Sequence, residues 1–180
     1  MNLTSFRRRS LTAIGIVALV AGSAVGCAPG PEPTPTPTSA FASEEEAFAA
    51  AEEVYRAYND AGNQRLAGSA TPNPQDFLTG TALEGDIEAL QMLDAEGVTL
   101  EGTVTMLSFT GVTAEIASSD ASVTAIVCLD ASATRVVNRD GRDVTPTTRE
   151  ETIAQMVSFT GAPARLQISA ETAAESSECQ

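Results

Sequence analysis

The sequence predicts an α+β domain in which N-terminal helices pack on a curved antiparallel sheet. Apolar residues recur every three or four positions before Gly97 and every second position after it. A run of helices followed by a run of strands is typical of this fold class. The chain has 180 residues, of which 43% are hydrophobic, so one small core fits besides the tails.

Helices are predicted for the first half of the folded region. Ser43 followed by Glu46 forms a capping box, which begins a helix. Its apolar stripe consists of Phe48, Ala51, Val54, Tyr55 and Tyr58. Asn73 before Pro74 predicts a second, short helix, and a third is expected over residues 82–96.

Strands are predicted from residue 98 onward. Residues 98–116 alternate in a β-branched, Thr-rich context, whereas residues 123–129 are apolar on both faces and form the expected central strand. The Asn-Arg-Asp-Gly sequence at residues 138–141 is a turn signal. Two final strands are expected over residues 152–159 and 164–170.

Residues 1–26 have the features of a lipoprotein signal peptide. Three arginines at positions 7–9 precede an apolar run of about 15 residues, shorter than the roughly 20 that span a bilayer. The Ala-Val-Gly-Cys sequence that ends at Cys27 resembles the lipobox of bacterial lipoproteins. We therefore expect palmitate at Cys27 and a lipid anchor on the extracytoplasmic side of the cell membrane. The alternative is ordinary signal-peptidase cleavage and secretion.

Residues 27–42 are expected to be a tether and residues 43–180 the extracytoplasmic domain. The Pro-Thr repeat cannot build a core and favours extended conformers. Such a segment holds a domain clear of the lipid headgroups.

The charge and composition exclude several classes of function. The whole chain has a net charge of −14, and from Cys27 onward seven arginines face 24 acidic residues, a net charge of −17. Nucleic acid is therefore not an expected partner. Because the chain lacks histidine and lysine, Ser-His-Asp triads, His-bearing zinc sites and Schiff-base lysines are excluded. No metal or cofactor is expected.

The three cysteines predict one disulfide bond. Lipidation removes Cys27 from the count and leaves Cys128 and Cys179 to pair in an oxidising compartment. The alternative is a buried, free Cys128 with a disordered tail.

Short motifs of the second half resemble those of a known group of proteins. They are Val-Cys-Leu-Asp at residues 127–130, Asp-Gly at 140–141, Asp-Val-Thr-Pro at 143–146 and the near-terminal Cys179. Together with the order of the elements, they resemble small actinobacterial lipoproteins with a nuclear transport factor 2-like (cystatin-like) domain. The resemblance covers residues 43–180 and implies a cone whose sheet curls around the long helix and leaves a pocket.

Three residues are candidates for that pocket. Tyr55 and Tyr58 lie on the helix expected to cover the sheet, and Asp130 ends the central strand on the same face as Cys128. In the alternative interpretation these residues have no functional role: Asp130 caps a turn, and the tyrosines pack in the core with their hydroxyls in water. The absence of a catalytic constellation favours a non-catalytic binding or interaction module for a small molecule or an envelope protein. The alternative is a small pocket enzyme that uses Asp130 for acid-base chemistry.

Overall fold

The computed structural model describes residues 39–179. The predicted signal peptide, Cys27 and most of the tether lie outside these residues, and none of the described helices is long and apolar enough to cross a membrane. The elements, in order, are α1 (Glu44–Leu66), η1 (Pro74–Phe77), α2 (Gly80–Glu96), β1 (Val98–Glu101), β2 (Thr105–Ile116), β3 (Ala121–Asp130), β4 (Arg135–Asn138), β5 (Thr152–Gly161), η2 (Pro163–Arg165), β6 (Gln167–Ala173) and η3 (Ser176–Cys179).

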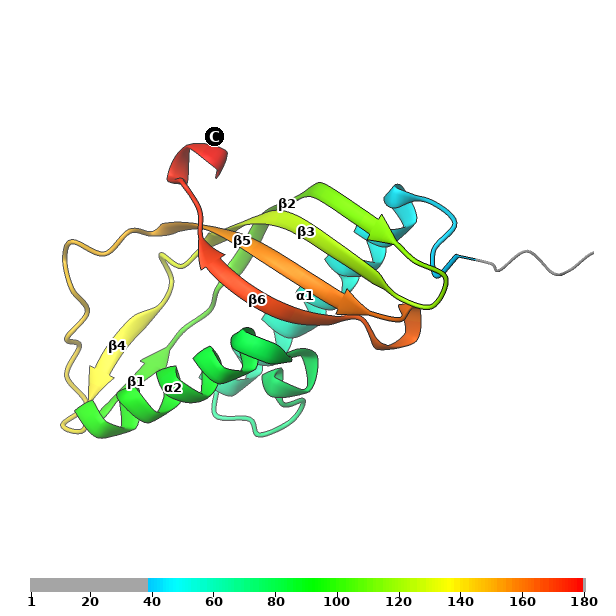
Figure 1. Cartoon of the computed structure of the whole chain (residues 1–180). Helices are drawn as coiled ribbons and strands as arrows, with labels where there is room; N and C mark the ends of the chain where they lie inside the picture. The colour runs from blue at the N-terminus through cyan, green and yellow to red at the C-terminus, as the bar shows by residue number, and fades with distance from the viewer. Residues whose placement is uncertain (1–38, 180) are drawn as a thin grey trace, which may run out of the picture. The chain divides into compact units, whose positions relative to one another are not determined.

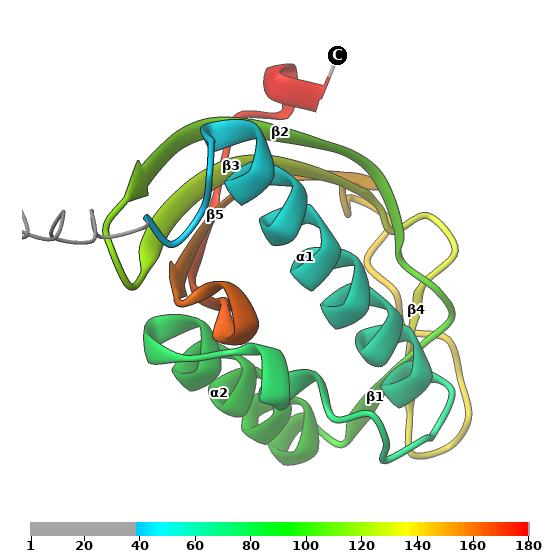
Figure 2. The same ribbon diagram turned by 90° about the vertical axis from the view of Figure 1, so that its right-hand side faces the viewer.

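A curved antiparallel sheet with the order β2-β3-β5-β6 forms the body of the domain (Figure 1). The sheet arches over α1, and α2 lies beside β6 (Figure 2). Strands β1 and β4 pair separately and form a small second sheet at one end. The predicted fold class, helices on a curved antiparallel sheet in a cone-like arrangement, is confirmed, and the sheet stays open.

The predicted capping box begins α1. The backbone N–H of Glu46 donates to Ser43 Oγ at 3.2 Å, and the backbone N–H of Ala42 donates to Glu46 Oε2 at 2.6 Å. The N–H group of Glu46, one of those that helix geometry leaves without a partner, thus has an acceptor, and the Glu46 side chain in turn fixes the backbone just before the helix. The short helix that begins after Asn73 is confirmed as well, since the Asn73 side chain accepts from Gln75 N.

The N-terminal half of α1 packs closely on the sheet. Ala47 and Ala51 are fully buried, and the Phe48 ring covers Gly111 of β2. A Cβ at position 111 would lie 2.4 Å from the Phe48 ring, so only glycine permits this approach. Small residues and one aromatic ring therefore fix this end of α1.

Strand β3 is the buried central strand that its sequence predicts. Its odd-numbered residues, such as Val123 and Val127, belong to the core beneath α1. Its even-numbered residues point to the other face, yet Ile126 and Cys128 are also buried. Cys128 is joined to Cys179, with the Cα atoms 5.6 Å apart, so the C-terminal turn lies against the face opposite α1 (Figure 1).

Two boundaries differ from the expected ones in a way that matters below. Strand β6 runs to Ala173 rather than residue 170, and β5 reaches Gly161. Continued pairing with β5 explains the extension, because Glu171 lies opposite Val157 and Ala173 opposite Gln155. The segment that follows the expected end of the last strand at residue 170 therefore begins as a continuation of that strand.

The disulfide is expected to contribute strongly to stability. It closes a loop with a sequence separation of 51, which corresponds to about 4 kcal/mol in the chain-entropy model. In denaturant unfolding under non-reducing conditions, Cys179→Ser should lower the free energy of unfolding by about this amount. The double variant Cys128→Ala/Cys179→Ser should lose no more than Cys179→Ser plus the small cost of repacking position 128. Two alkylatable thiols in the oxidised wild-type domain would contradict the bond.

Candidate functional site

A cavity of about 220 Å³ lies between the C-terminal half of α1 and the sheet. Helix α1 and strands β3, β5 and β6 supply its main walls. The residues that matter for its chemistry are Tyr55, Tyr58, Gly62, Leu129, Gln155 and Glu171.

The two predicted tyrosines do meet at this cavity. They lie three positions apart on α1, and their rings make an edge-to-face contact with centroids 5.6 Å apart. The Tyr55 hydroxyl donates to Gln155 Oε1 at 3.1 Å, and the Tyr58 hydroxyl donates to Glu171 Oε2 at 3.3 Å. Both hydroxyls therefore have side-chain partners from the sheet, rather than the water expected from the sequence.

Glu171 is the carboxylate of the cavity. It faces α1 from β6, and burial raises its pKa while the hydrogen bond from Tyr58 and the nearby hydroxyl of Tyr55 oppose part of the rise. Burial and the neighbouring charge of Glu171 also raise the pKa of Tyr58. The tyrosines therefore keep their protons at neutral pH and act as donors.

Asp130, the predicted carboxylate, lies outside the cavity, and this prediction is wrong. It shares a strand face with Cys128, and that face points away from α1. Its Oδ1 accepts from Ser132 N at 2.8 Å, so it caps the turn after β3, and this hydrogen bond lowers the pKa of Asp130. The turn-capping interpretation is confirmed.

Sequence reasoning missed Glu171 because of an irregularity in β6. Ile168 pairs with Phe159 and Glu171 with Val157, and a register shift lies between these pairs. Residues three positions apart therefore share the core-facing side, which strict alternation does not allow. No pattern in the sequence signals this bulge.

Two asparagines of α1 close one side of the cavity. Asn63 both donates to Val104 O at 2.9 Å and accepts from Val104 N at 2.8 Å, and Asn59 also donates to Val104 O at 3.1 Å. Their amides hold the segment before β2 against α1. This leaves Glu171 as the acceptor with the most unused capacity in the cavity.

An ion pair connects α1 to α2 beside the cavity. Arg65 donates to both carboxylate oxygens of Asp86, at 2.6 and 3.0 Å, and Gln75 adds a third hydrogen bond. Burial acts to raise the pKa of Asp86, but these hydrogen bonds outweigh it and lower the pKa. Asp86 is thus ionised at neutral pH and neutralises Arg65.

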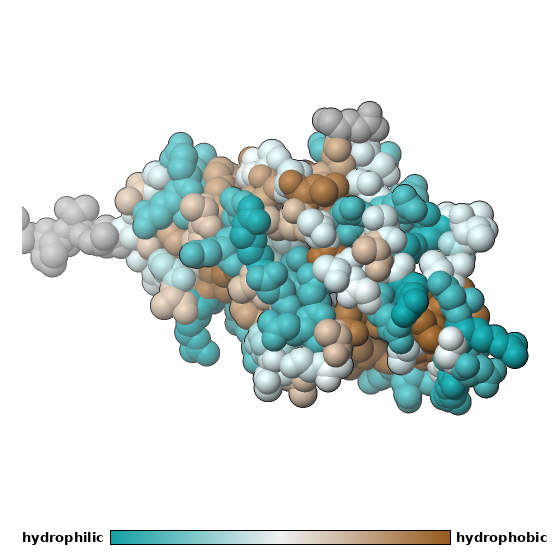
Figure 3. All heavy atoms as spheres, turned by 180° about the vertical axis from the view of Figure 1, so that it is seen from behind, coloured by the Kyte–Doolittle hydropathy of each residue, from teal (hydrophilic) through white to brown (hydrophobic). Residues whose placement is uncertain are grey.

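A second cavity of about 340 Å³ adjoins the first and shares Arg65, Leu66 and Leu100 with it. Its other walls include Leu90 and Leu93 of α2 and Val98 of β1. Figure 3 shows apolar atoms at this end of the molecule, which carries β1, β4 and the C-terminal end of α2. The second cavity thus has an apolar wall, while Arg65, Asp86, Asp94 and Thr99 supply its polar part.

Gly62 widens the first cavity. It lies inside α1, where glycine costs about 1 kcal/mol relative to alanine. A Cβ added there would have no atom within 4 Å, in contrast to Gly111. Neither the backbone nor the packing of α1 requires a glycine at this position, so its one visible effect is to leave the cavity open.

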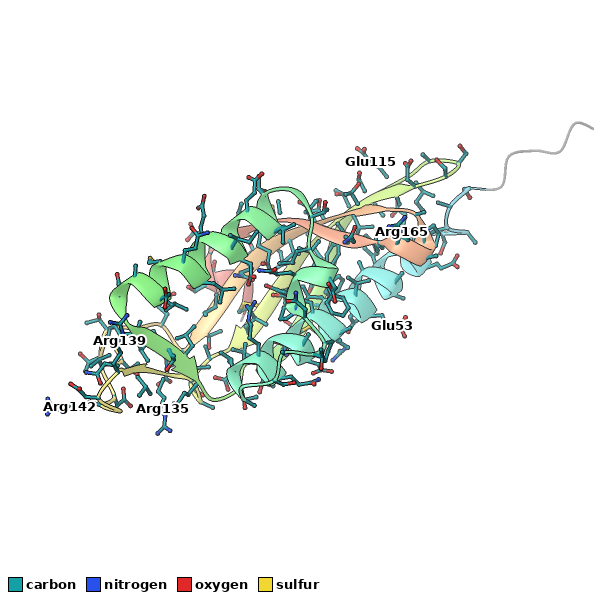
Figure 4. The ribbon with its side chains drawn as sticks, turned by 90° about the horizontal axis from the view of Figure 1, so that it is seen from below. Glu53, Glu115, Arg135, Arg139, Arg142 and Arg165 are labelled. Atoms are coloured by element: carbon teal, nitrogen blue, oxygen red, sulfur yellow. A yellow bond between two sulfur atoms is a disulfide. The ribbon has the colours of Figure 1, made fainter. Side chains whose placement is uncertain are left out.

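Charged side chains at the ends of the domain do not take part in this site. Arg135, Arg139 and Arg142 lie at the end that carries β4 (Figure 4). Arg135 pairs with Glu101 at 2.8 Å, and Arg139 donates to the α2 carbonyl of Asp94. These contacts stabilise the small sheet.

Comparison with models of protein families and with curated proteins gives no match. Among solved structures, the intermembrane space region of the chloroplast protein ARC6 is similar over 70% of this chain and 95% of that chain. The TM-score is 0.47 and the sequence identity 11%, so this distant likeness carries no argument about function.

Replacing the cavity carboxylate is expected to stabilise the fold. Because the folded pKa of Glu171 is raised, its contribution to stability is fully present below the unfolded value of 4.5 and is lost as pH rises through the folded pKa. Glu171→Gln keeps an acceptor for Tyr58 without the buried charge, so it should unfold at higher denaturant than the wild type at pH 7. The difference should shrink toward pH 4.

Glu115→Gln is the matched control, because Glu115 is exposed on β2 (Figure 4). It should leave the unfolding midpoint nearly unchanged. If Glu171→Gln is less stable than the wild type at neutral pH, the Glu171 carboxylate does not destabilise the fold.

Proposed function

We propose that this protein is an extracytoplasmic lipoprotein of the nuclear transport factor 2-like type whose domain is a non-catalytic binding module for a small molecule. The N-terminal pattern ending at Cys27 supports the lipid anchor, and the cone-like arrangement of sheet and α1 supports the fold type. The net charge of −17 from Cys27 onward argues against nucleic acid as a partner.

The observation that carries the binding function is the cavity itself. Its walls combine aromatic rings, apolar side chains and a half-buried carboxylate, the mixture typical of small-molecule sites. Gly62 adds to this evidence, because α1 would be more stable with a side chain at that position. A residue in a cavity wall that lowers the stability of the protein is characteristic of functional sites.

The position of the cavity suits a tethered domain. Near the start of the described chain, Ala40 N donates to Ala117 O, beside the turn between β2 and β3. The cavity is lined by residues toward the other end of α1, a helix of 23 residues or about 35 Å. Figures 1 and 2 show the course of α1. A tether that ends near Ala40 would therefore join the domain at the end of α1 opposite the cavity.

The anchor is tested by metabolic labelling in a bacterial host. Labelled palmitate should be incorporated into the wild-type protein, and this protein should fractionate with membranes. The Cys27→Ser variant should remain unlabelled. Wild-type protein found wholly in the medium with a free thiol would contradict the lipid anchor and favour secretion.

The binding site is tested with two helical glycines that differ in one respect. An added Cβ meets nothing within 4 Å at either Gly62 or Gly85, but only Gly62 lines the cavity. Gly62→Leu should fill the cavity and weaken binding of compounds found by a thermal-shift screen by about tenfold or more, equal to ~1.4 kcal/mol. Gly85→Leu should bind like the wild type.

Melting curves of both variants check that they fold, and each should gain stability from the better helix propensity of leucine. Compounds that bind Gly62→Leu and the wild type equally would show that the cavity is not the binding site. A screen of cationic, neutral and anionic compounds without any binder would contradict the binding function.

A further inference from the structure

We propose that the ligand is an organic ammonium ion, a compound with a protonated amine beside Glu171 and an apolar tail that extends toward α2. This inference rests on the proposed binding function and deepens it. The charge of Glu171, the aromatic rings beside it and the apolar character of the adjoining cavity carry the argument.

Glu171 lacks a cationic partner among residues 39–179. The ion pairs found there are Arg56–Glu52, Arg65–Asp86 and Arg135–Glu101. Arg65 reaches the cavity wall, but both of its terminal nitrogens are engaged by Asp86. The ionised form of Glu171 thus gives the cavity a net negative charge, and a half-buried charge without a partner is costly. A bound cation would remove that cost.

The tyrosines favour an ammonium ion over other partners. Tyr55 is 2% exposed and packs in the core, so the partly buried ring of Tyr58 provides the aromatic surface beside the carboxylate, and aromatic rings attract organic cations when water is excluded. The Tyr58 hydroxyl donates to only one carboxylate oxygen, Oε2, so an N⁺–H donor can bind Oε1. A carboxylate ligand would meet the charge of Glu171, and the acidic domain would repel it during approach.

The adjoining cavity accounts for the tail. Leu66 and Leu100 line both cavities, and Leu90, Leu93 and Val98 line only the second. Leu90 is 38% exposed and Leu100 is also 38% exposed, so apolar surface remains for a ligand to cover. A short alkyl chain on the amine would gain from this burial.

The groups that face Glu171 predict how the affinity depends on pH. They are Tyr55 and Tyr58 from α1 and the charge of Asp86 from α2, which Arg65 neutralises. Burial raises the pKa of Glu171, and the protonated carboxyl cannot pair with an ammonium ion. Affinity for an amine should therefore fall as pH decreases through the pKa of Glu171.

The experiment compares three probes of equal chain length by titration calorimetry on the tetherless domain, residues 39–180, after its folding is checked by circular dichroism. The probes are n-hexylammonium, n-hexanol and hexanoate at pH 7. n-Hexylammonium should bind at least about tenfold more tightly than either of the others, a difference of ~1.4 kcal/mol. Ethylammonium should bind more weakly than n-hexylammonium because it cannot reach the second cavity.

Two variants separate head from tail recognition. Glu171→Gln should lose about tenfold in n-hexylammonium affinity and little in hexanol affinity, whereas the surface control Glu115→Gln should lose neither. Leu90→Asn should weaken n-hexylammonium but not ethylammonium. Melting curves verify that all variants remain folded.

The outcomes distinguish this inference from the proposed function. If hexanol or hexanoate binds as tightly as the amine, or if Glu171→Gln binds the amine normally, the ammonium ligand is wrong. If none of the probes binds while screened neutral or anionic compounds bind in a Gly62-dependent way, the ammonium ligand is wrong and the binding function stands. If Gly62→Leu does not weaken any binder, the cavity is not the binding site and both proposals for this cavity fail.

Discussion

The contact between Phe48 and Gly111 determines where the rest of α1 can lie. It brings the N-terminal half of the helix so close to β2 that a single Cβ cannot fit between them. From Tyr55 onward, α1 also makes polar contacts, although Tyr55 and Ala61 are themselves buried. These contacts are Tyr55 with Gln155, Tyr58 with Glu171, Asn63 with Val104 and Arg65 with Asp86.

The change from apolar to polar contact along one helix explains why a cavity exists. Close-packed apolar contacts tolerate few voids, whereas long polar side chains meet at their tips and leave space beside their stems. Gly62 lies in this polar half and leaves the space unfilled. The site is therefore a consequence of how α1 is attached, and Glu171 is the one charge within it that the described protein leaves without a counterion.

The sequence predicted those features that depend on residues close together in the chain or on the number of cysteines. Ser43 and Glu46 form their capping box because both partners lie within one turn, and the pairing of Cys128 with Cys179 followed from parity. The central position of β3 followed from its apolar residues on both faces. Tyr55 and Tyr58 were found because a helical stripe shows which residues point inward.

The carboxylate of the site could not be predicted by the same reasoning. Because both faces of β3 are apolar, the pattern does not show which one α1 covers, and Asp130 was assigned to the wrong side. To predict the position of Glu171, one has to know two features of the tertiary structure. They are the extension of β6 beyond residue 170 and the register shift near Ser158. Both arise from pairing with β5, which leaves no local signature in β6.

The state of Glu171 is the most direct test of this account. A ¹³C-detected NMR titration of the side-chain carboxyl, assigned by comparison with the spectrum of Glu171→Gln, measures its pKa in the folded domain. We expect a midpoint above the ordinary value of 4.5, because burial beside Tyr55 and Tyr58 disfavours the charged form. A midpoint at or below 4.5 would mean that Glu171 is well solvated, and it would contradict a half-buried, unpaired charge in the cavity.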